Sequence, residues 1–294
     1  MITGTDSGGP QAAVLDLPHG VRLAVEGAGT GPAVLLLHGI GGHRGQWRRQ
    51  TLALADRFGV IAWDARNYGD SHGPRITRFD AFAEDLFALL EALGLGRVIA
   101  VGHSMGGRIL MEAALARPER FAGLVLSGAQ PAYLEHMAPE ARAAYVEKRA
   151  GMFAEGVVSP DMAARVAAEV LPADTPADVR AALAADFARL RPEGYLAALE
   201  ASAGWSRAAE VGRLRMPVAV LGGALDTVCP PAECHRLATA LAQGPATILE
   251  GVGHMAQIEA PETVTDILRT FAGAHGPAAG RFDAAALGRR EMPA

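Results

Sequence analysis

The sequence predicts an α/β protein in which helices cover both faces of a mostly parallel sheet. Apolar segments of strand length recur along the chain, and segments with helical periodicity lie between many of them. The segment 98–101 is apolar throughout, which is typical of a strand buried on both faces. Between residues 130 and 212 the alternation stops, and this Ala-rich stretch predicts a separate group of helices.

Eight strands are expected in the sheet, and the first two are expected to be antiparallel. Since ligands of such sheets bind outside the carboxyl ends of the strands, the functional residues are expected at that edge. The expected strands cover residues 12–17, 21–27, 33–38, 60–64, 97–102, 121–127, 217–222 and 246–250. The expected helices of the sheet layers cover residues 46–56, 79–93, 105–116, 231–242 and 261–272.

The chain is expected to consist of a core, a helical insertion and a tail. The core combines residues 1–129 with residues 213–272, and residues 130–212 form about four or five helices that act as a lid. Residues 273–294 are rich in Ala, Gly and charge and are expected to be a flexible tail. Helix starts are indicated by proline, whose missing N–H would be unpaired there, or by a Ser or Thr cap: Pro139, Ser159-Pro160, Thr175-Pro176, Pro192 and Ser206.

The composition restricts the partners of this protein. Its 294 residues are 50% hydrophobic, which is enough for a large core, and they carry a formal net charge of −5. No cluster of Lys and Arg forms a basic stripe, so nucleic acid is excluded as a partner. No apolar run approaches the roughly 18–20 residues that span a bilayer, so no membrane association is expected.

The sequence also predicts the cellular location of the protein and its remaining partners. The segment MITGTDSGGP at the start has neither a basic region nor an apolar stretch, and therefore predicts no signal peptide. Cys229 and Cys234 are close in sequence and are expected to be reduced thiols of a cytoplasmic protein. The expected partner is a small-molecule substrate, without a cofactor or a metal ion. The sequence leaves a homo-oligomer open.

Two serines lie in the pattern G-x-S-x-G, which is typical of a nucleophile on a sharp strand-to-helix turn. Ser104 follows the apolar segment 98–101 and precedes a segment with helical periodicity that ends before Pro118. Ser71 is followed by Gly73 and Pro74, which do not start a helix smoothly, so it is interpreted as a loop serine. We therefore expect Ser104 to be the nucleophile.

A serine hydroxyl needs a base, and the base needs an acid that orients it. Of the nine histidines, His254 follows the last expected strand within a Gly-x-Gly-His segment and is the predicted base. Asp226 follows the strand at 217–222 and is the predicted acid, although it could instead cap the next helix. The alternative acid position, after the strand at 121–127, holds no acidic residue. His38 and His103 flank motif glycines and are interpreted as braces of the backbone.

Acyl transfer also needs two backbone donors for the oxyanion. One is expected to be the N–H of Met105, which follows the nucleophile at the start of a helix. The other is expected from the loop after the strand at 33–38, as the N–H of Ile40. Gly41 and Gly42 in this loop could also form an ordinary flexible turn.

With these motifs the chain resembles the α/β-hydrolase superfamily. The resemblance covers about residues 33–255 and rests on His38-Gly39 with Gly41-Gly42, the segment 63–71 (WDARNYGDS), Gly102–Gly107, Asp226 and His254. It implies the α/β-hydrolase fold with an inserted helical lid. It also implies that Ser71 is the last serine of a structural D-x-R-G-x-G-x-S loop. Asn67 replaces a glycine of that loop, and we expect the left-handed backbone to be kept because Asn tolerates it.

The resemblance favours one branch of the superfamily over several others. Dehalogenases and epoxide hydrolases of the superfamily use aspartate at the position of Ser104, and perhydrolases and haloperoxidases carry an aromatic residue at the position of Ile40. Hydrolases that cleave C–C bonds of ring-fission products share the S-M-G-G run but have asparagine at the position of His103. The chain is most similar to the enol-lactonase and small-ester hydrolase branch.

The sequence therefore predicts a serine hydrolase that cleaves a small-molecule ester, lactone or amide through an acyl-enzyme. The alternatives are a C–C bond hydrolase, a cofactor-free oxygenase or lyase on the same fold, and a receptor that keeps the site for binding. Residues that could line the substrate pocket, each with the alternative of a place in the core, are Trp47, Tyr133, Met137, Tyr145, Met152, Phe153, Trp205, Val228 and Met255. Arginines that could bind a substrate carboxylate, each with the alternative of a solvated helix face, are Arg44, Arg108, Arg142, Arg149 and Arg165.

Overall fold

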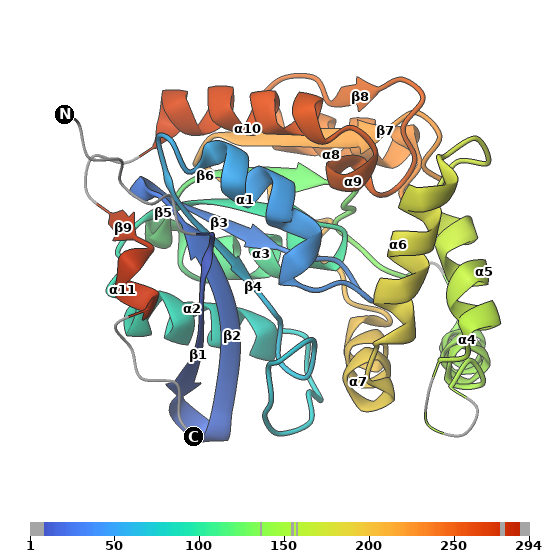
Figure 1. Cartoon of the computed structure of the whole chain (residues 1–294). Helices are drawn as coiled ribbons and strands as arrows, with labels where there is room; N and C mark the ends of the chain where they lie inside the picture. Colours follow the sequence, from blue (N-terminus) through green and yellow to red (C-terminus); the bar gives the residue numbers. More distant parts are fainter. Residues whose placement is uncertain (1–8, 136, 154–155, 157, 277–279, 289–294) are drawn as a thin grey trace.

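A computed structural model describes residues 9–135, 137–153, 156, 158–276 and 280–288. In this part of the chain, nine strands form one sheet, eight of them in the order β1-β2-β4-β3-β5-β6-β7-β8. The first two strands pair antiparallel and β3 to β8 are parallel, which confirms the predicted α/β fold (Figure 1). The strands are β1 (Gln11–Leu17), β2 (Val21–Ala28), β3 (Thr30–Leu37), β4 (Gly59–Trp63), β5 (Val98–His103), β6 (Phe121–Ser127), β7 (Val218–Gly223), β8 (Thr247–Leu249) and β9 (Arg281–Asp283).

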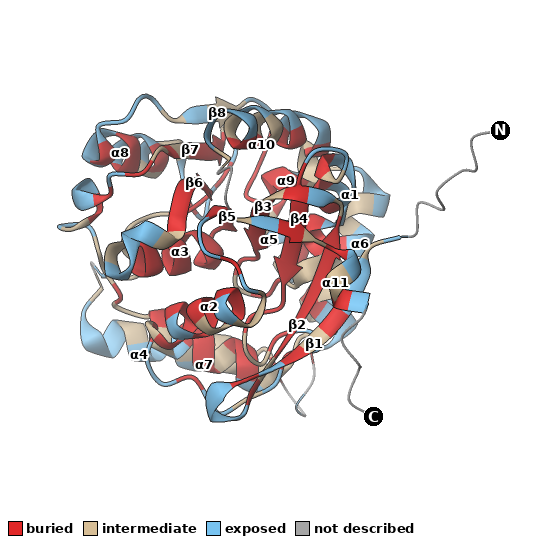
Figure 2. Ribbon diagram, turned by 90° about the vertical axis from the view of Figure 1, so that its left-hand side faces the viewer, coloured by how far each residue is buried: buried red, intermediate tan, exposed pale blue. Residues whose placement is uncertain are grey.

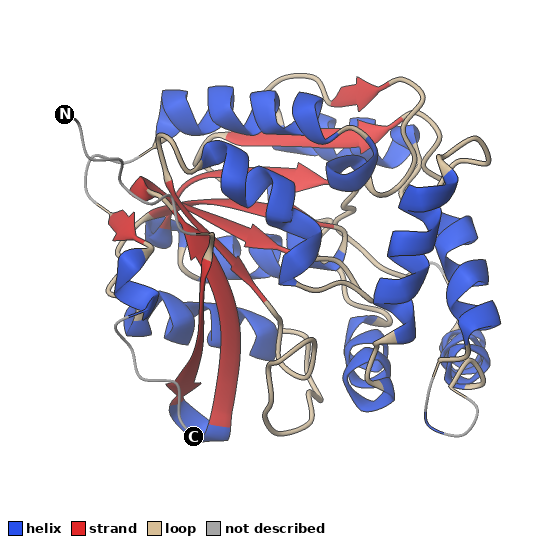
Figure 3. Cartoon of the chain, in the orientation of Figure 1, coloured by secondary structure: helices blue, strands red, loops and turns tan. Residues whose placement is uncertain are grey.

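Helices cover the sheet on two sides (Figure 3). The side chains of α2, α3 and α8 belong to one apolar cluster, and those of α1, α9 and α10 belong to another. These helices are α1 (Arg48–Leu54), α2 (Ala81–Ala92), α3 (Met105–Ala116), α8 (Pro231–Leu241), α9 (Ala256–Glu259) and α10 (Pro261–His275).

The central strands are buried on both faces, as the apolar segments predict (Figure 2). In β3, Leu35 and Leu37 belong to the cluster under α2 and α3, whereas Val34 and Leu36 belong to the cluster under α1 and α10. Since side chains alternate between the faces of a strand, an apolar residue is needed at every position.

The helical insertion lies beyond the carboxyl ends of the parallel strands, where the arrowheads of β3, β5, β6 and β7 point in Figure 1. In its described part it contains α4 (Pro139–Ala150), α5 (Pro160–Val170), α6 (Ala177–Ala188) and α7 (Pro192–Ser202). Ser159 caps α5 by accepting a hydrogen bond from the N–H of Met162, as predicted. The expected start at Ser206 is wrong: this residue forms an isolated bridge with Ala132 and precedes no α-helix, because its backbone pairs across the insertion.

The expectation of a flexible tail does not hold for residues 273–275, which belong to α10, or for residues 281–288. Residues 281–283 form β9, which pairs antiparallel with the start of β3, and α11 (Ala285–Gly288) follows. Phe282 and Leu287 are buried in the apolar cluster of α2 and α3. Two apolar side chains within a stretch of small and charged residues therefore hold this segment on the sheet. Residues 277–279 and 289–294 of the expected tail lie outside the described residues.

Candidate active site

Ser104 lies on a sharp turn between β5 and α3. Its backbone has φ 51° and ψ −112°, a conformation that costs about 1–3 kcal/mol outside glycine. The turn is tight enough to need glycine nearby, because a Cβ on Gly106 would lie 2.5 Å from the carbonyl oxygen of Leu37. Among the described residues, the Ser104 hydroxyl makes no hydrogen bond. A strained serine with a free hydroxyl is the arrangement that the sequence predicted for a nucleophile.

Asp226 and His254 come together at the carboxyl ends of β7 and β8. The Nδ1 atom of His254 lies 2.7 Å from one carboxylate oxygen of Asp226. The other carboxylate oxygen accepts hydrogen bonds of 2.8 Å from the N–H groups of Val228 and Cys229. Asp226 does not cap α8, whose N-cap is Pro230. Both side chains are buried, and the hydrogen bond to the carboxylate occupies the Nδ1 atom of the imidazole.

The loop that carries His254 is held by Glu259, which the sequence analysis did not single out. Its two carboxylate oxygens accept hydrogen bonds of 2.7 Å from the N–H groups of Gly253 and Met255, on either side of the histidine. Burial raises the pKa of Glu259. Its place in the first turn of α9 gave no sequence signal, because a helical Glu usually faces solvent.

Two backbone N–H groups are the candidates for an oxyanion site. Met105 is the first residue of α3, so its N–H has no partner within the helix. Ile40 follows β3 in the loop that lines the same cavity as Ser104. Neither N–H donates a hydrogen bond within the described part of the chain. The oxyanion role of Ile40 and Met105 stays a prediction.

His38 and His103 differ in what they contact. The Nε2 atom of His38 accepts a hydrogen bond of 3.0 Å from Ala65, and its Nδ1 donates to the carbonyl of Gly39 at 2.7 Å. Burial lowers the pKa of His38 to about 4, so it is a neutral brace between two loops. His103 packs against His254 with ring centroids 4.7 Å apart, and burial holds its pKa well below the usual range.

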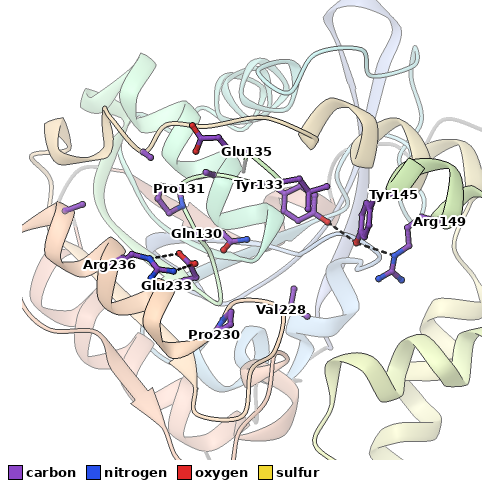
Figure 4. A pocket seen from close by; sticks show the side chains of 14 residues that line it. Gln130, Pro131, Tyr133, Glu135, Tyr145, Arg149, Val228, Pro230, Glu233 and Arg236 are labelled. Atoms are coloured by element: carbon purple, nitrogen blue, oxygen red, sulfur yellow. Dashed lines mark hydrogen bonds and ion pairs between the residues drawn. The ribbon is translucent and has the colours of Figure 1, made fainter. Parts of the chain in front are cut away.

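Ser104 and His254 line one cavity of about 100 Å³. The helical insertion contributes apolar, aromatic and charged side chains to its wall. Insertion residues in its wall are Tyr133, Tyr145, Arg149, Val166, Glu169, Val170, Phe187 and Tyr195. A second, wider cavity of about 690 Å³ shares Tyr133, Tyr145, Arg149 and Val228 with the first. In Figure 4 the hydroxyls of Tyr133 and Tyr145 point toward each other, and Arg149 donates to Tyr145.

The predicted pocket residues divide into two groups. Tyr133, Tyr145, Val228 and Met255 line the cavity of Ser104. Trp47 and Trp205 are core residues instead, and the indole N–H of Trp205 donates to Glu112 at 2.8 Å. Large aromatic side chains occur both in protein cores and in pocket walls. The sequence alone therefore could not show that these two indoles belong to the core. The expected residues that do not line the cavity are Trp47, Met137, Met152, Phe153 and Trp205.

The five candidate arginines differ in their ion-pair partners and in whether they line the cavity. Arg44 forms ion pairs with Asp64 and Asp70, outside the cavity. Arg142 and Arg165 do not line the cavity, and Arg165 is exposed. Arg108 and Arg149 do line it.

The segment 63–71 forms the loop that the resemblance implied. The Ser71 hydroxyl donates to the carbonyl of Asp64 at 2.7 Å and accepts from the N–H of Ala24 at 2.8 Å. The expected left-handed backbone of Asn67 is confirmed by its φ of 66°. Ser71 therefore holds the loop to the sheet.

The comparison with known protein families agrees with this architecture. A family model described as "alpha/beta hydrolase fold" matches residues 32–261. The chain belongs to this family. In the described residues, no helix is both long and apolar enough to cross a bilayer, and no group of three or more His, Cys, Asp or Glu side chains could hold a metal ion.

Several relatives and solved structures are esterases or lactonases. A thermophilic esterase from Thermogutta terrifontis, solved with malate bound, has a TM-score of 0.81 and 29% identity, covering 91% of this chain and all of that one. A pimeloyl-[acyl-carrier protein] methyl ester esterase of Chromobacterium violaceum is 32% identical over 75% of this chain and 86% of its own length. The 3-oxoadipate enol-lactonase 2 of Acinetobacter baylyi is 28% identical over 82% of this chain and 89% of its own length. The chain spans about a third of the length of the uncharacterized Mycobacterium proteins that it also matches.

Proposed function

We propose that this protein is a serine hydrolase of small-molecule carboxylic esters or lactones, with Ser104 as nucleophile, His254 as base and Asp226 as the acid that orients it. The observation that carries the proposal is the Asp226–His254 hydrogen bond beside a strained serine in one cavity. The printed activities of the esterase and lactonase relatives support this class of bond.

The proposed reaction is acyl transfer to water in two steps. The Nε2 atom of His254 takes the proton of Ser104 as the hydroxyl attacks the carbonyl carbon. The N–H groups of Met105 and Ile40 stabilise the oxyanion, and His254 then protonates the leaving group. Water, deprotonated by the same imidazole, hydrolyses the acyl-enzyme. The buried carboxylate of Asp226 stabilises the imidazolium that forms in both steps.

The helical insertion is proposed to act as the lid of this cavity. Eight of its residues line the cavity, and the carbonyl of Val170 in α5 accepts a hydrogen bond of 3.1 Å from the N–H of His254. The insertion is thus tied to the base itself. Exclusion of water by such a cover strengthens the hydrogen bonds to a developing oxyanion.

Active-site labelling tests the proposal directly. A fluorophosphonate probe should label the protein at Ser104 and not at Ser71, as read by mass spectrometry of the digested protein. A panel of esters, lactones and amides should then show hydrolysis that pre-labelling abolishes. Labelling elsewhere, or hydrolysis that persists in fully labelled protein, contradicts the proposed nucleophile. Oxygen uptake with a heteroaromatic substrate, or cleavage of a C–C bond without ester hydrolysis, would favour the alternative reactions on this fold.

A further inference from the structure

Arg108 lies one helical turn after Ser104 on α3. Its N–H donates to the carbonyl of Ser104 at 3.2 Å, so helix geometry ties the two residues together. Its side chain lines the same cavity as Ser104 and His254 and is only 3% exposed. A positively charged group is therefore buried beside the site of the proposed chemistry.

Within the part of the chain that the structure describes, this guanidinium has no anionic partner. Among the described residues Arg108 forms no ion pair and no side-chain hydrogen bond, and its Nη1 atom is buried without a partner. It lies instead over the rings of Tyr133, at 4.1 Å, and Phe79, at 5.9 Å. Burial lowers its pKa to about 10, so it is still protonated at neutral pH.

Another arginine shows how a carboxylate usually pairs a buried guanidinium. Arg66 is also largely buried, and it forms two hydrogen bonds with the carboxylate of Asp85. In the cavity, the carboxylate of Glu169 lies 3.1 Å from Arg149 and is thus already paired. A buried, unpaired charge is costly, so such groups are rare unless a ligand completes them. Of the two described arginines that line this cavity, Arg149 has a carboxylate partner and Arg108 has none.

We propose that Arg108 binds a carboxylate of the substrate, so that the natural substrate carries an acidic group a few carbon atoms from the carbonyl that Ser104 attacks. This proposal rests on the proposed function and deepens it. The two residues are one helical turn, about 5.4 Å, apart along α3 and line the same cavity, so one small ligand can contact both. The cavity volume of about 100 Å³ also suits a short chain. A guanidinium binds a carboxylate through two parallel hydrogen bonds, and the aromatic rings of Tyr133 and Phe79 keep it in place.

The experiment compares two esters that differ only in the terminal group. Monoethyl glutarate carries a carboxylate where ethyl pentanoate carries a methyl group. The wild-type protein should hydrolyse the acidic ester with at least a roughly tenfold higher kcat/KM, and Arg108→Met should lower the ratio of the two values about 10- to 100-fold. Arg108→Lys should restore part of the ratio. Arg165→Met, which removes an exposed charge of α5 outside the cavity, should leave the ratio within about twofold.

A binding measurement keeps this inference separate from the proposed hydrolysis. Free glutarate should raise the melting temperature of the wild type and of Ser104→Ala, and much less that of Arg108→Met. If neither ester is cleaved but glutarate binds through Arg108, the proposed reaction is wrong and the carboxylate site stands. If the wild type shows neither a preference for the acidic ester nor stabilisation by glutarate, the carboxylate site is wrong. A Met variant that slows both esters equally also contradicts it, because Arg108 would then be structural.

Discussion

Ser71 and Ser104 occupy the same G-x-S-x-G pattern, and both are buried, but their surroundings are opposite. The Ser71 hydroxyl has a donor and an acceptor from two different places in the sheet, Ala24 within β2 and Asp64 directly after β4. The Ser104 hydroxyl has no hydrogen bond among the described residues, its backbone is strained, and it faces a cavity. One serine uses its hydroxyl to join elements, and the other leaves it available.

The difference shows how to separate a structural serine from a candidate nucleophile. A buried hydroxyl is normally satisfied by hydrogen bonds, since leaving it unpaired costs free energy. Ser104 makes no such hydrogen bond among the described residues, and its backbone is held in a conformation that few non-glycine residues adopt. A strained residue whose hydroxyl is left available in a cavity is a candidate for function. The following experiments test whether the two serines differ as this comparison requires.

The largest expected effect is that of Ser104→Ala on turnover. Removing the nucleophile should lower kcat for the best ester of the panel by around 10⁶-fold. The variant should fold normally, because the hydroxyl makes no hydrogen bond that folding requires. Steady-state kinetics and circular dichroism of the purified variant check both statements. Residual activity within about tenfold of the wild type would remove Ser104 from the mechanism.

Asp226→Asn should have the next largest effect. An amide in this place no longer favours the Nδ1–H tautomer of His254, so kcat should fall by around 10⁴-fold. The N–H groups of Val228 and Cys229 can still donate to the amide oxygen, so the loop should keep its shape. Labelling of Ser104 by the fluorophosphonate probe should slow in parallel. Equal labelling rates in the variant and the wild type would mean that Asp226 does not orient the base.

The hydrogen bonds of His38 predict that the free energy of unfolding depends on pH. Neutral His38 joins the loop after β3 to the loop that carries Ser71. Its pKa is about 4 in the folded protein, below the 6.5 of an unfolded chain, so the unfolded state binds the proton first. Its contribution is therefore complete above about pH 6.5 and is lost as the pH falls to about 4, up to about 3 kcal/mol.

Denaturant titrations between pH 7 and pH 4.5 measure this slope. His38→Gln supplies the control, because a glutamine amide can donate to the Gly39 carbonyl and accept from Ala65 without titrating. The free energy of unfolding should fall less steeply with decreasing pH in this variant than in the wild type. Identical slopes would show that His38 does not titrate as described.

The smallest effect is expected from Ser71→Ala, and it should appear in stability. The change leaves the buried N–H of Ala24 and the carbonyl of Asp64 without a partner, which should cost about 1–3 kcal/mol. Turnover of the folded variant should stay within about threefold of the wild type. Urea unfolding and ester hydrolysis measure the two quantities. A variant that is fully stable but inactive would reverse the roles of the two serines.

Much of this arrangement could be predicted from the sequence, because it depends on local pattern. Apolar segments located the strands, proline located the starts of α4, α5 and α7, and the order of Ser104, Asp226 and His254 along the chain identified the candidate triad. The strand and helix signals each extend over a few residues, within the reach of period and cap arguments, and the order of the triad is the one that the family resemblance implies.

The rest depends on partners that are far away in sequence. From the sequence, five arginines were equal candidates for binding a substrate carboxylate. Only the tertiary structure shows that Arg108, among the described residues, has no carboxylate partner. The strand β9 depends on pairing with β3, about 250 residues earlier, which no local period reveals. The role of Glu259 could not be predicted, because its two carboxylate oxygens bind the loop of His254 only when that loop has folded back onto the side chain.

The position of β9 has a practical consequence for handling the protein. This strand pairs with Thr30–Pro32 at the amino end of β3, whereas Ile40 follows the carboxyl end. A strand of that length separates the two by roughly 26 Å. In Figure 1, β9 and α11 lie on the side away from α4–α7. A dye or a surface linker attached near α11 would therefore leave the mouth of the cavity open to solution.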